Sequence, residues 1–276
     1  VRARATTPGW RASSSSDRRP ARPAGDHVES GRVSVPMNRL RQAIDLSSSG
    51  AAVVVPITDH ESDAEVAALA AAGADSVELR IDRFADDSAT SVIDRARRAG
   101  DLAVLATVRI PNEGGEWGRS EVDRSDLFRS ILGHVDAIDV ELAALGDDGP
   151  IREVVLEAKA AGVAVVVSAH DFAGTPGVDE LTRLHADAIE AGADIVKLAT
   201  TAHDRDALRR LATVLVATDH PSAFVAMGDL GPTSRVFFPA LGSVLTYAHG
   251  GRHQLPGQLD VASTAELLDR FAPPSS

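Results

Sequence analysis

The sequence predicts a single (β/α)8 barrel, and three observations lead to this prediction. Short apolar runs alternate with stretches of helical period, and this alternation occurs eight times from about Ala51 onward. Continuous apolar strands joined by helices imply a parallel sheet covered by helices, and eight such units close into a barrel. The competing doubly wound sheet carries a glycine-rich phosphate turn after its first strand. The sequence VPITDHESD at residues 55–63 contains no such turn.

The first four units each pair a run rich in Val and Ala with a longer amphipathic stretch. Strands are expected at residues 51–57, 75–81, 102–108 and 135–142. Helices are expected at residues 61–73, 88–100, 125–134 and 149–162. The turns AAGAD and AAGVA place Gly73 and Gly162 at helix ends, where a left-handed C-cap favours glycine.

The last four units repeat the same pattern. Strands are expected at residues 163–170, 193–200, 222–228 and 243–249. Helices are expected at residues 177–192, 202–217, 232–242 and 261–272. The turn EAGAD places Gly192 at the end of the helix at 177–192, as in the first half of the chain.

Residues 1–48 are expected to be a disordered tail, and residues 49–276 the catalytic barrel. The tail contains RASSSSDRRPARPAG and almost no large apolar side chains, so it cannot bury enough surface to fold. Its Arg and Ser content is also found in transit peptides, but its acidic residues and prolines spoil the amphipathic pattern. A flexible tail, or upstream sequence ahead of a start at Met37, is therefore the favoured interpretation.

The composition of the chain excludes several classes of function. The net charge of −12 argues against a nucleic-acid partner, which requires a basic face. The chain has no cysteine, which excludes disulfides and thiolate chemistry. No apolar run approaches the length of a membrane span. The sequence HGGRH spaces His249 and His253 for a metal, but it lies in a glycine-rich loop, so we expect no metal site.

Candidate functional residues follow from the fold, because the chemistry of a barrel takes place at the carboxyl ends of its strands. Polar side chains are expected there from every strand except the first. They are Glu78, Arg80, Arg109, Glu113, Asp139, Glu141, His170, Asp171, Lys197, Ser234, Arg235, Gln254 and Gln258.

Lys197 stands in the middle of the apolar run GADIVKLAT. Burial should lower its pKa, and a lysine that is neutral at working pH attacks ketones and aldehydes to form a Schiff base. The alternative is a structural lysine that pairs with a carboxylate such as Glu141. His170 ends the neighbouring strand and could take and return a proton near neutral pH, or it could be a structural histidine.

Three arginines, Arg80, Arg109 and Arg235, are expected to face one another across the barrel mouth. Several like charges in one cleft need anions, and a substrate carboxylate could supply one to a guanidinium fork. The alternative is a ring of salt bridges with Glu78, Glu113 and Glu141 that only stabilises the end of the barrel.

Seven short motifs resemble the type I 3-dehydroquinase family. They are VELRIDRF, TVR with EGGE, IDVEL, SAHDF with TP, GADIVKLA, MG with SR, and PGQ, and they occur in the order of that family between Val53 and about Val261. The resemblance implies dehydration of 3-dehydroquinate to 3-dehydroshikimate. It implies that Lys197 forms the Schiff base, that His170 acts as general base and then acid, and that Glu113 orients the histidine.

The resemblance also implies how the substrate is held. Glu78, Arg80 and Arg109 would hydrogen-bond its ring hydroxyls, and Arg235 and Gln258 would bind its carboxylate. No metal and no cofactor are implied. The expected protein is cytoplasmic, and the resemblance suggests a homodimer.

Two positions depart from the motifs of the family. The family commonly has a serine where this chain has Gln254, and some members have a contacting serine where this chain has Pro56. Two other functions remain open at this point. An aldolase-type Schiff-base barrel would need a phosphate site, and a sensor that binds a quinate-like ligand would not need Lys197, His170 and Glu113 together.

Overall fold

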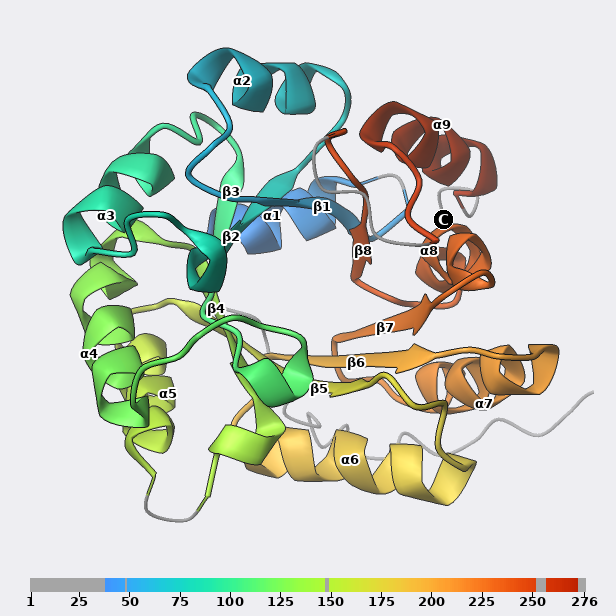
Figure 1. Ribbon diagram of the computed structural model, residues 1–276. Helices are drawn as coiled ribbons and strands as arrows, with labels where there is room; N and C mark the ends of the chain where they lie inside the picture. The colour runs from blue at the N-terminus through green and yellow to red at the C-terminus, as the bar shows by residue number, and fades with distance from the viewer. Residues whose placement is uncertain (1–37, 48, 147–148, 252–256, 273–276) are drawn as a thin grey trace, which may run out of the picture. The chain divides into compact units, whose positions relative to one another are not determined.

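The computed structural model describes residues 38–47, 49–146, 149–251 and 257–272, and these residues form the predicted (β/α)8 barrel (Figure 1). In this part of the chain, eight parallel strands pair in the order β7-β6-β5-β4-β3-β2-β1-β8. An isolated parallel bridge between Ser222 of β7 and Ser243, two residues before β8, connects the two ends of the sheet. The strands are β1 (Ala52–Ile57), β2 (Ser76–Arg80), β3 (Ala103–Thr107), β4 (Ala137–Glu141), β5 (Ala164–Asp171), β6 (Ile195–Thr201), β7 (Ser222–Met227) and β8 (Leu245–Tyr247).

A helix follows each strand and lies on the outer side of the barrel (Figure 1). These helices are α2 (Asp63–Ala71), α3 (Ala89–Arg97), α4 (Glu121–Ile131), α5 (Pro150–Ala160), α6 (Val178–Glu190), α7 (Arg205–Val216), α8 (Gly231–Ala240) and α9 (Val261–Phe271). No helix in the described ranges has both the length and the apolar character needed to span a membrane.

Helix α4 begins four residues earlier than the sequence predicted. Ser120 caps it, because its side chain accepts from the Asp123 N–H while the Asp123 carboxylate accepts from the Ser120 N–H. This capping box satisfies backbone donors that would otherwise be unpaired in the first turn. The residues Leu132–His134, which were predicted as the end of this helix, form a separate 3-10 turn.

The alternation of side chains along each strand produces two apolar layers. Outward-facing residues such as Val53, Val77 and Val165 pack against the surrounding helices. Inward-facing residues form a second cluster with small side chains where the strands begin, namely Ala52, Ala103, Ala137, Ala164 and Ala223. Because the side-chain period of a strand is two, Lys197 points inward like its neighbours Ile195 and Ala199, which belong to the inner cluster.

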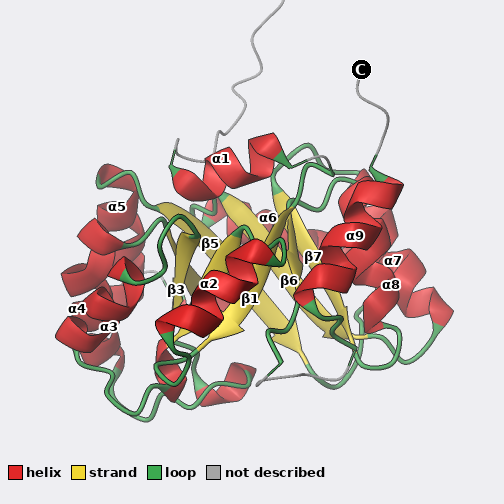
Figure 2. Ribbon diagram, turned by 90° about the horizontal axis from the view of Figure 1, so that it is seen from above, coloured by secondary structure: helices red, strands yellow, loops and turns green. Residues whose placement is uncertain are grey.

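The first helix, α1 (Arg39–Leu46), corrects the predicted boundary of the tail. Residues 39–46 were assigned to the disordered segment, but they form a helix that Asn38 caps. Leu40 and Ile44 belong to the inner cluster, so α1 covers the end of the barrel at which the strands begin (Figure 2). The ion pair between Arg39 Nη2 and Asp136 Oδ2 spans 2.9 Å and holds the helix there. The prediction for residues 1–37 falls outside the described residues.

This packing predicts that Leu40→Ala destabilises the barrel. Leu40 is fully buried, and replacing such a leucine by alanine costs about 2–5 kcal/mol of unfolding free energy. Gln42→Ala, an exposed position on the same helix, should change it by less than about 0.5 kcal/mol. Urea unfolding followed by circular dichroism measures both, and equal stabilities would show that α1 does not contribute to the core.

Candidate active site

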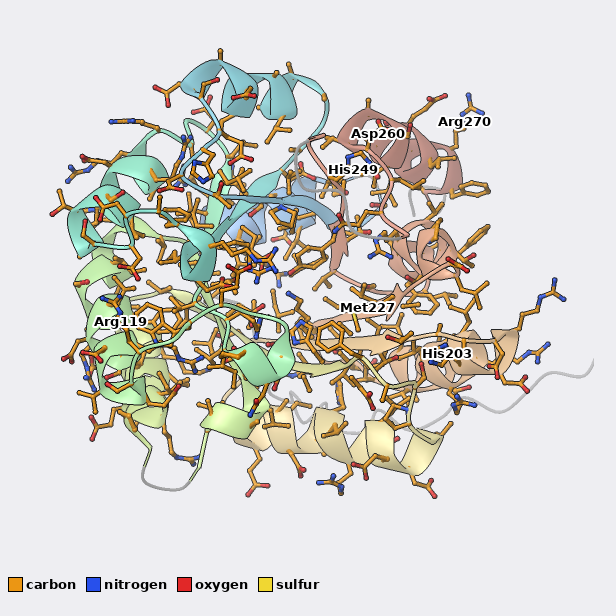
Figure 3. The ribbon with its side chains drawn as sticks, viewed as in Figure 1. Arg119, His203, Met227, His249, Asp260 and Arg270 are labelled. Carbon is orange, nitrogen blue, oxygen red and sulfur yellow. The ribbon has the colours of Figure 1, made fainter. Side chains whose placement is uncertain are left out.

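A cavity of about 390 Å³ opens at the carboxyl ends of the strands. All eight residues that the sequence analysis singled out for catalysis and substrate binding line it: Glu78, Arg80, Arg109, Glu113, His170, Lys197, Arg235 and Gln258. Met227, which is labelled in Figure 3, lines the cavity from the end of β7. The fold thus gathers residues from six different strands and from the loops that follow them.

Lys197 reaches into this cavity from the middle of β6, and its side chain is only 7 % exposed. Its Nζ donates to Asp139 Oδ2 over 2.9 Å and lies 3.7 Å from Glu78 Oε1. Burial lowers the pKa of Lys197, but the nearby charges of Asp139 and Glu78 outweigh burial and raise this pKa above its ordinary value. The prediction that burial leaves the amine uncharged is therefore wrong for the unliganded protein. The two carboxylates beside Lys197 favour its ammonium form.

Asp139 is the buried carboxylate that pairs with Lys197. It was among the polar residues expected at the strand ends, but no role was predicted for it. Its Oδ1 accepts from Ser168 Oγ over 2.6 Å, and its Oδ2 accepts from Lys197 and lies 2.8 Å from Arg109 Nη2. Burial alone would raise the pKa of Asp139, but Arg109 and Lys197 hold it well below the usual range. In the sequence IDVEL, Asp139 and Glu141 alternate with apolar residues. This alternation indicates that both carboxylates lie on the inward face of β4.

Glu141 is not the partner of Lys197 that the sequence analysis considered. Its carboxylate pairs with two arginines instead, at 3.2 Å from Arg109 Nη1 and 2.7 Å from Arg124 Nη1. It also accepts from the Ile110 N–H over 3.0 Å. Lys197, Asp139, Arg109, Glu141 and Arg124 therefore form a continuous buried series of alternating charges. Each carboxylate in the series lies between two cations, which compensates the cost of burying it.

His170 and Glu113 form a second pair on the wall of the cavity. Glu113 Oε2 lies 2.8 Å from His170 Nδ1 and accepts from the His170 backbone N–H over 3.1 Å. Burial lowers the pKa of His170 well below its ordinary value, and the charges of Arg109 and Lys197 lower it further. Burial raises the pKa of Glu113 to about 7, against the opposing effect of Arg109. The surroundings therefore favour the neutral imidazole and bring the pKa of the Glu113 carboxyl group close to neutral pH.

Two glycines shape the loop that carries Glu113. Gly114 adopts a left-handed backbone conformation with φ of 81° directly after the 3-10 turn Pro111–Glu113. Gly115 packs against the backbone of Arg109 so closely that a Cβ atom would lie 1.9 Å from the Arg109 carbonyl oxygen. Only glycine fits at this position, which explains why EGGE follows the strand that ends near Arg109.

The remaining predicted residues surround the cavity with different partners. Arg80 makes a bidentate pair with Asp82, with distances of 3.0 and 2.8 Å. Glu78 Oε1 accepts from Thr107 Oγ1 over 2.8 Å. Gln258 is buried at the cavity wall.

Arg235 differs from the other arginines of the cavity. Its Nη1 donates to the Ala226 carbonyl oxygen over 2.9 Å, and no carboxylate among the described residues forms an ion pair with it. Burial lowers the pKa of Arg235 to about 10, and its Nε has no hydrogen-bond partner in the described part of the chain. It is a buried cation that lines the cavity and has no anionic partner within the described ranges.

The two departures from the family motifs can be placed only in part. Pro56 lines the cavity from β1, whereas Gln254 lies outside the described residues. His253 of the sequence HGGRH also lies outside them. His249 forms a backbone bridge with Asp260 near the start of α9 (Figure 3). No group of His, Asp and Glu side chains within the described ranges could hold a metal ion.

Comparison with known proteins gives one consistent result. The sequence model of the type I 3-dehydroquinase family matches residues 51–272. A 3-dehydroquinate dehydratase from Methanosarcina barkeri is 36 % identical over 238 residues, which cover 82 % of this chain and 96 % of that protein. The crystal structure of a 3-dehydroquinate dehydratase from Geobacillus kaustophilus superposes with a TM-score of 0.74 at 28 % identity, covering 82 % of this chain and 93 % of the other.

A further similar structure is that of a type I 3-dehydroquinate dehydratase from Clostridium difficile with covalent modified comenic acid. It superposes with a TM-score of 0.74 at 28 % identity and covers 82 % of this chain and 94 % of the other.

The close approach at Gly115 generates a prediction. Gly115→Ala should lower the free energy of unfolding by about 1–3 kcal/mol, because the added methyl group overlaps the Arg109 backbone. The displaced loop should also move Glu113 away from His170, which shifts the NMR signals of the His170 ring. Gly118→Ala is the matched control, since a Cβ atom there meets open space. A Gly115→Ala variant with the stability and ring signals of the wild type would contradict this account of the loop.

Proposed function

The chain belongs to the type I 3-dehydroquinase family, and from this membership we propose that it dehydrates 3-dehydroquinate through an imine formed by Lys197. The observation that carries the proposal is the position of the Lys197 nitrogen. It is buried at the base of a cavity that also contains the His170–Glu113 pair and the guanidinium of Arg235, which forms no ion pair with the described residues. A nucleophile, a proton carrier and an anion site are the groups that this reaction requires.

In the first step, the Lys197 amine attacks the C3 ketone of the substrate and water leaves to give a protonated imine. The Lys197 ammonium gives up a proton before it attacks, and a proton is taken up again by the hydroxyl group of the addition product when that group leaves as water. The iminium ion then restores a positive charge beside Asp139, where the ammonium stood. Asp139 is held in place by Ser168 and Arg109, so it stabilises the charge before and after condensation without reorganising.

In the second step, His170 removes a proton from C2. The iminium accepts the electrons of the broken C–H bond, so the product is a neutral enamine instead of a carbanion. His170 then returns the proton to the C1 hydroxyl group, which leaves as water. Hydrolysis of the imine releases 3-dehydroshikimate and the free amine. On β5, Ser168 is the residue that pairs in register with Lys197 of β6. His170 lies two residues further along β5, and therefore closer to the cavity mouth than the Lys197 position.

The substrate would be held by its charge and its hydroxyl groups. Arg235, with Gln258 beside the same cavity, would bind the carboxylate, since an arginine without an ion-pair partner gains most from a bidentate anion. Glu78 and Arg80 would contact ring hydroxyls. Arg109 lines the same cavity, and its proposed contact with the substrate adds to the ion pairs that it already makes with Asp139 and Glu141.

Borohydride trapping tests the function and its nucleophile together. The chain contains two lysines, Lys159 and Lys197, so a reduced adduct with 3-dehydroquinate can be assigned without ambiguity by peptide mass. We expect the wild type and Lys159→Arg to dehydrate the substrate and to form the adduct, and Lys197→Ala to do neither. Lys159 pairs with Asp194, and Arg preserves that pair.

His170→Ala should still form the adduct but turn over about 10²- to 10⁴-fold more slowly, which is the usual loss of general acid–base catalysis. Binding of 3-dehydroquinate by the wild type without turnover or adduct would instead support a sensor. An adduct on Lys159 alone would remove Lys197 from the mechanism.

The pKa of Glu113 predicts how the rate depends on pH. Below about pH 7 the Glu113 carboxyl group is protonated and donates to His170 Nδ1, which puts the ring proton on Nε2 and blocks it as a base. Above this pH the carboxylate accepts from Nδ1–H and leaves Nε2 free. The value of kcat/KM should therefore rise with pH through about 7.

Glu113→Gln provides the matched variant for this pH dependence. Its amide oxygen can accept from Nδ1–H at every pH, but it cannot ionise. The rate should be lower, and the rise near pH 7 should disappear. A profile near pH 7 that Glu113→Gln leaves unchanged would show that another group titrates there.

A further inference from the structure

Tyr247 is the only tyrosine of the chain, and neither the motifs nor the proposed mechanism uses it. It is the last residue of β8 and pairs in register with Val54 of β1, so its side chain joins the inner cluster. It is 5 % exposed, and it lines the cavity that contains Lys197. The residue is therefore buried in the protein and borders the site.

The ring of Tyr247 faces the nucleophile. Lys197 Nζ lies 4.4 Å from the ring centroid, within the range of a cation–π interaction. A ring at this position can stabilise the ammonium ion, and it can stabilise the iminium ion of the proposed intermediate in the same way. A phenylalanine ring would do this equally well, so the ring does not explain the hydroxyl group.

The hydroxyl oxygen of Tyr247 makes no hydrogen bond of normal geometry with the residues that the structure describes, and the Lys197 side chain acts on it only as a weak donor. A buried polar group without a partner destabilises a protein, and buried tyrosine hydroxyls are usually paired. The neighbouring Thr246 shows the usual case, because its hydroxyl donates to the Arg235 carbonyl oxygen over 2.8 Å. A tyrosine hydroxyl without a well-formed partner, on a residue that lines the cavity, points to a partner that the bound substrate supplies.

We propose that the Tyr247 hydroxyl hydrogen-bonds an oxygen of the bound substrate, next to the carbon that Lys197 attacks. This inference rests on the proposed function, which brings a hydroxylated cyclic ketone to the Lys197 nitrogen. The carbonyl carbon must come within bonding distance of Nζ, and Nζ lies over the Tyr247 ring, so the ketone and its neighbouring hydroxyl pass beside this side chain. Burial raises the pKa of Tyr247, against the opposing charge of Lys197, so the phenol keeps its proton and can donate.

Tyr247→Phe tests the hydroxyl alone. It keeps the ring, so we expect the variant to fold, to remain at least as stable as the wild type, and to form the borohydride adduct on Lys197. Its kcat/KM for 3-dehydroquinate should fall about 3- to 10-fold, as expected for the loss of one neutral hydrogen bond. Tyr247→Leu, which also removes the ring from Lys197, should lose more activity than Tyr247→Phe. Tyr247→Phe with kcat and KM within about twofold of the wild type would overturn the proposal.

A single tyrosine also permits a direct spectroscopic test on the intact protein. Tyrosine labelled with carbon-13 at the carbon that bears the hydroxyl gives one resonance, which responds to hydrogen bonding of that group. We expect this resonance to move when the adduct with 3-dehydroquinate is trapped, and an unmoved resonance would contradict the proposal. If the wild type itself neither turned over nor formed an adduct, the proposed function would fail, which is a separate result.

Discussion

Asp139 forms the interaction on which the chemistry of the cavity depends. It lies between Arg109 and Lys197, and it receives a third hydrogen bond from Ser168. A buried carboxylate is unfavourable unless cations and donors surround it, and removing one partner from a buried pair costs about 3–5 kcal/mol. Asp139 therefore keeps Lys197 charged and inside the barrel. Through Arg109 it is also linked to Glu141 and so to the base of the loop that carries Glu113.

The barrel makes this arrangement possible because its inward-facing side chains change from apolar to polar along the strands. Small apolar residues such as Ala103 and Ala137 fill the end where the strands begin, and α1 covers that end. Two residues further along, the inward positions become polar, as at Asp139. The apolar layer excludes water from below, which strengthens every charge interaction above it. The chemistry can then proceed at the open end, in a cavity whose walls are held by the sheet.

Burial lowers the pKa of both Lys197 and His170, and the charges beside each group explain why the net shifts are opposite. Lys197 has two carboxylates within 3.7 Å, so its positive form is favoured despite desolvation. His170 lies near Arg109 and Lys197, so its positive form is disfavoured twice. The cavity thus favours a cation where the proposed imine would form and a neutral imidazole where the proposed mechanism places the base. Tyr247 adds a ring against the cation and a phenol that keeps its proton.

The sequence by itself determined the alternation of eight strands and helices, the inward position of Lys197, and the set of residues that meet at the strand ends. Hydrophobic periodicity is local, so it can be read without knowing the neighbours. Only the tertiary structure decided that Lys197 pairs with Asp139 and not with Glu141, because these partners are 58 positions apart and both carboxylates point inward from one strand. The helix α1 escaped prediction for a related reason, since its two buried side chains gain stability only against the finished barrel. Charge state and pairing depend on distances between remote residues, and those distances exist only after the sheet has closed.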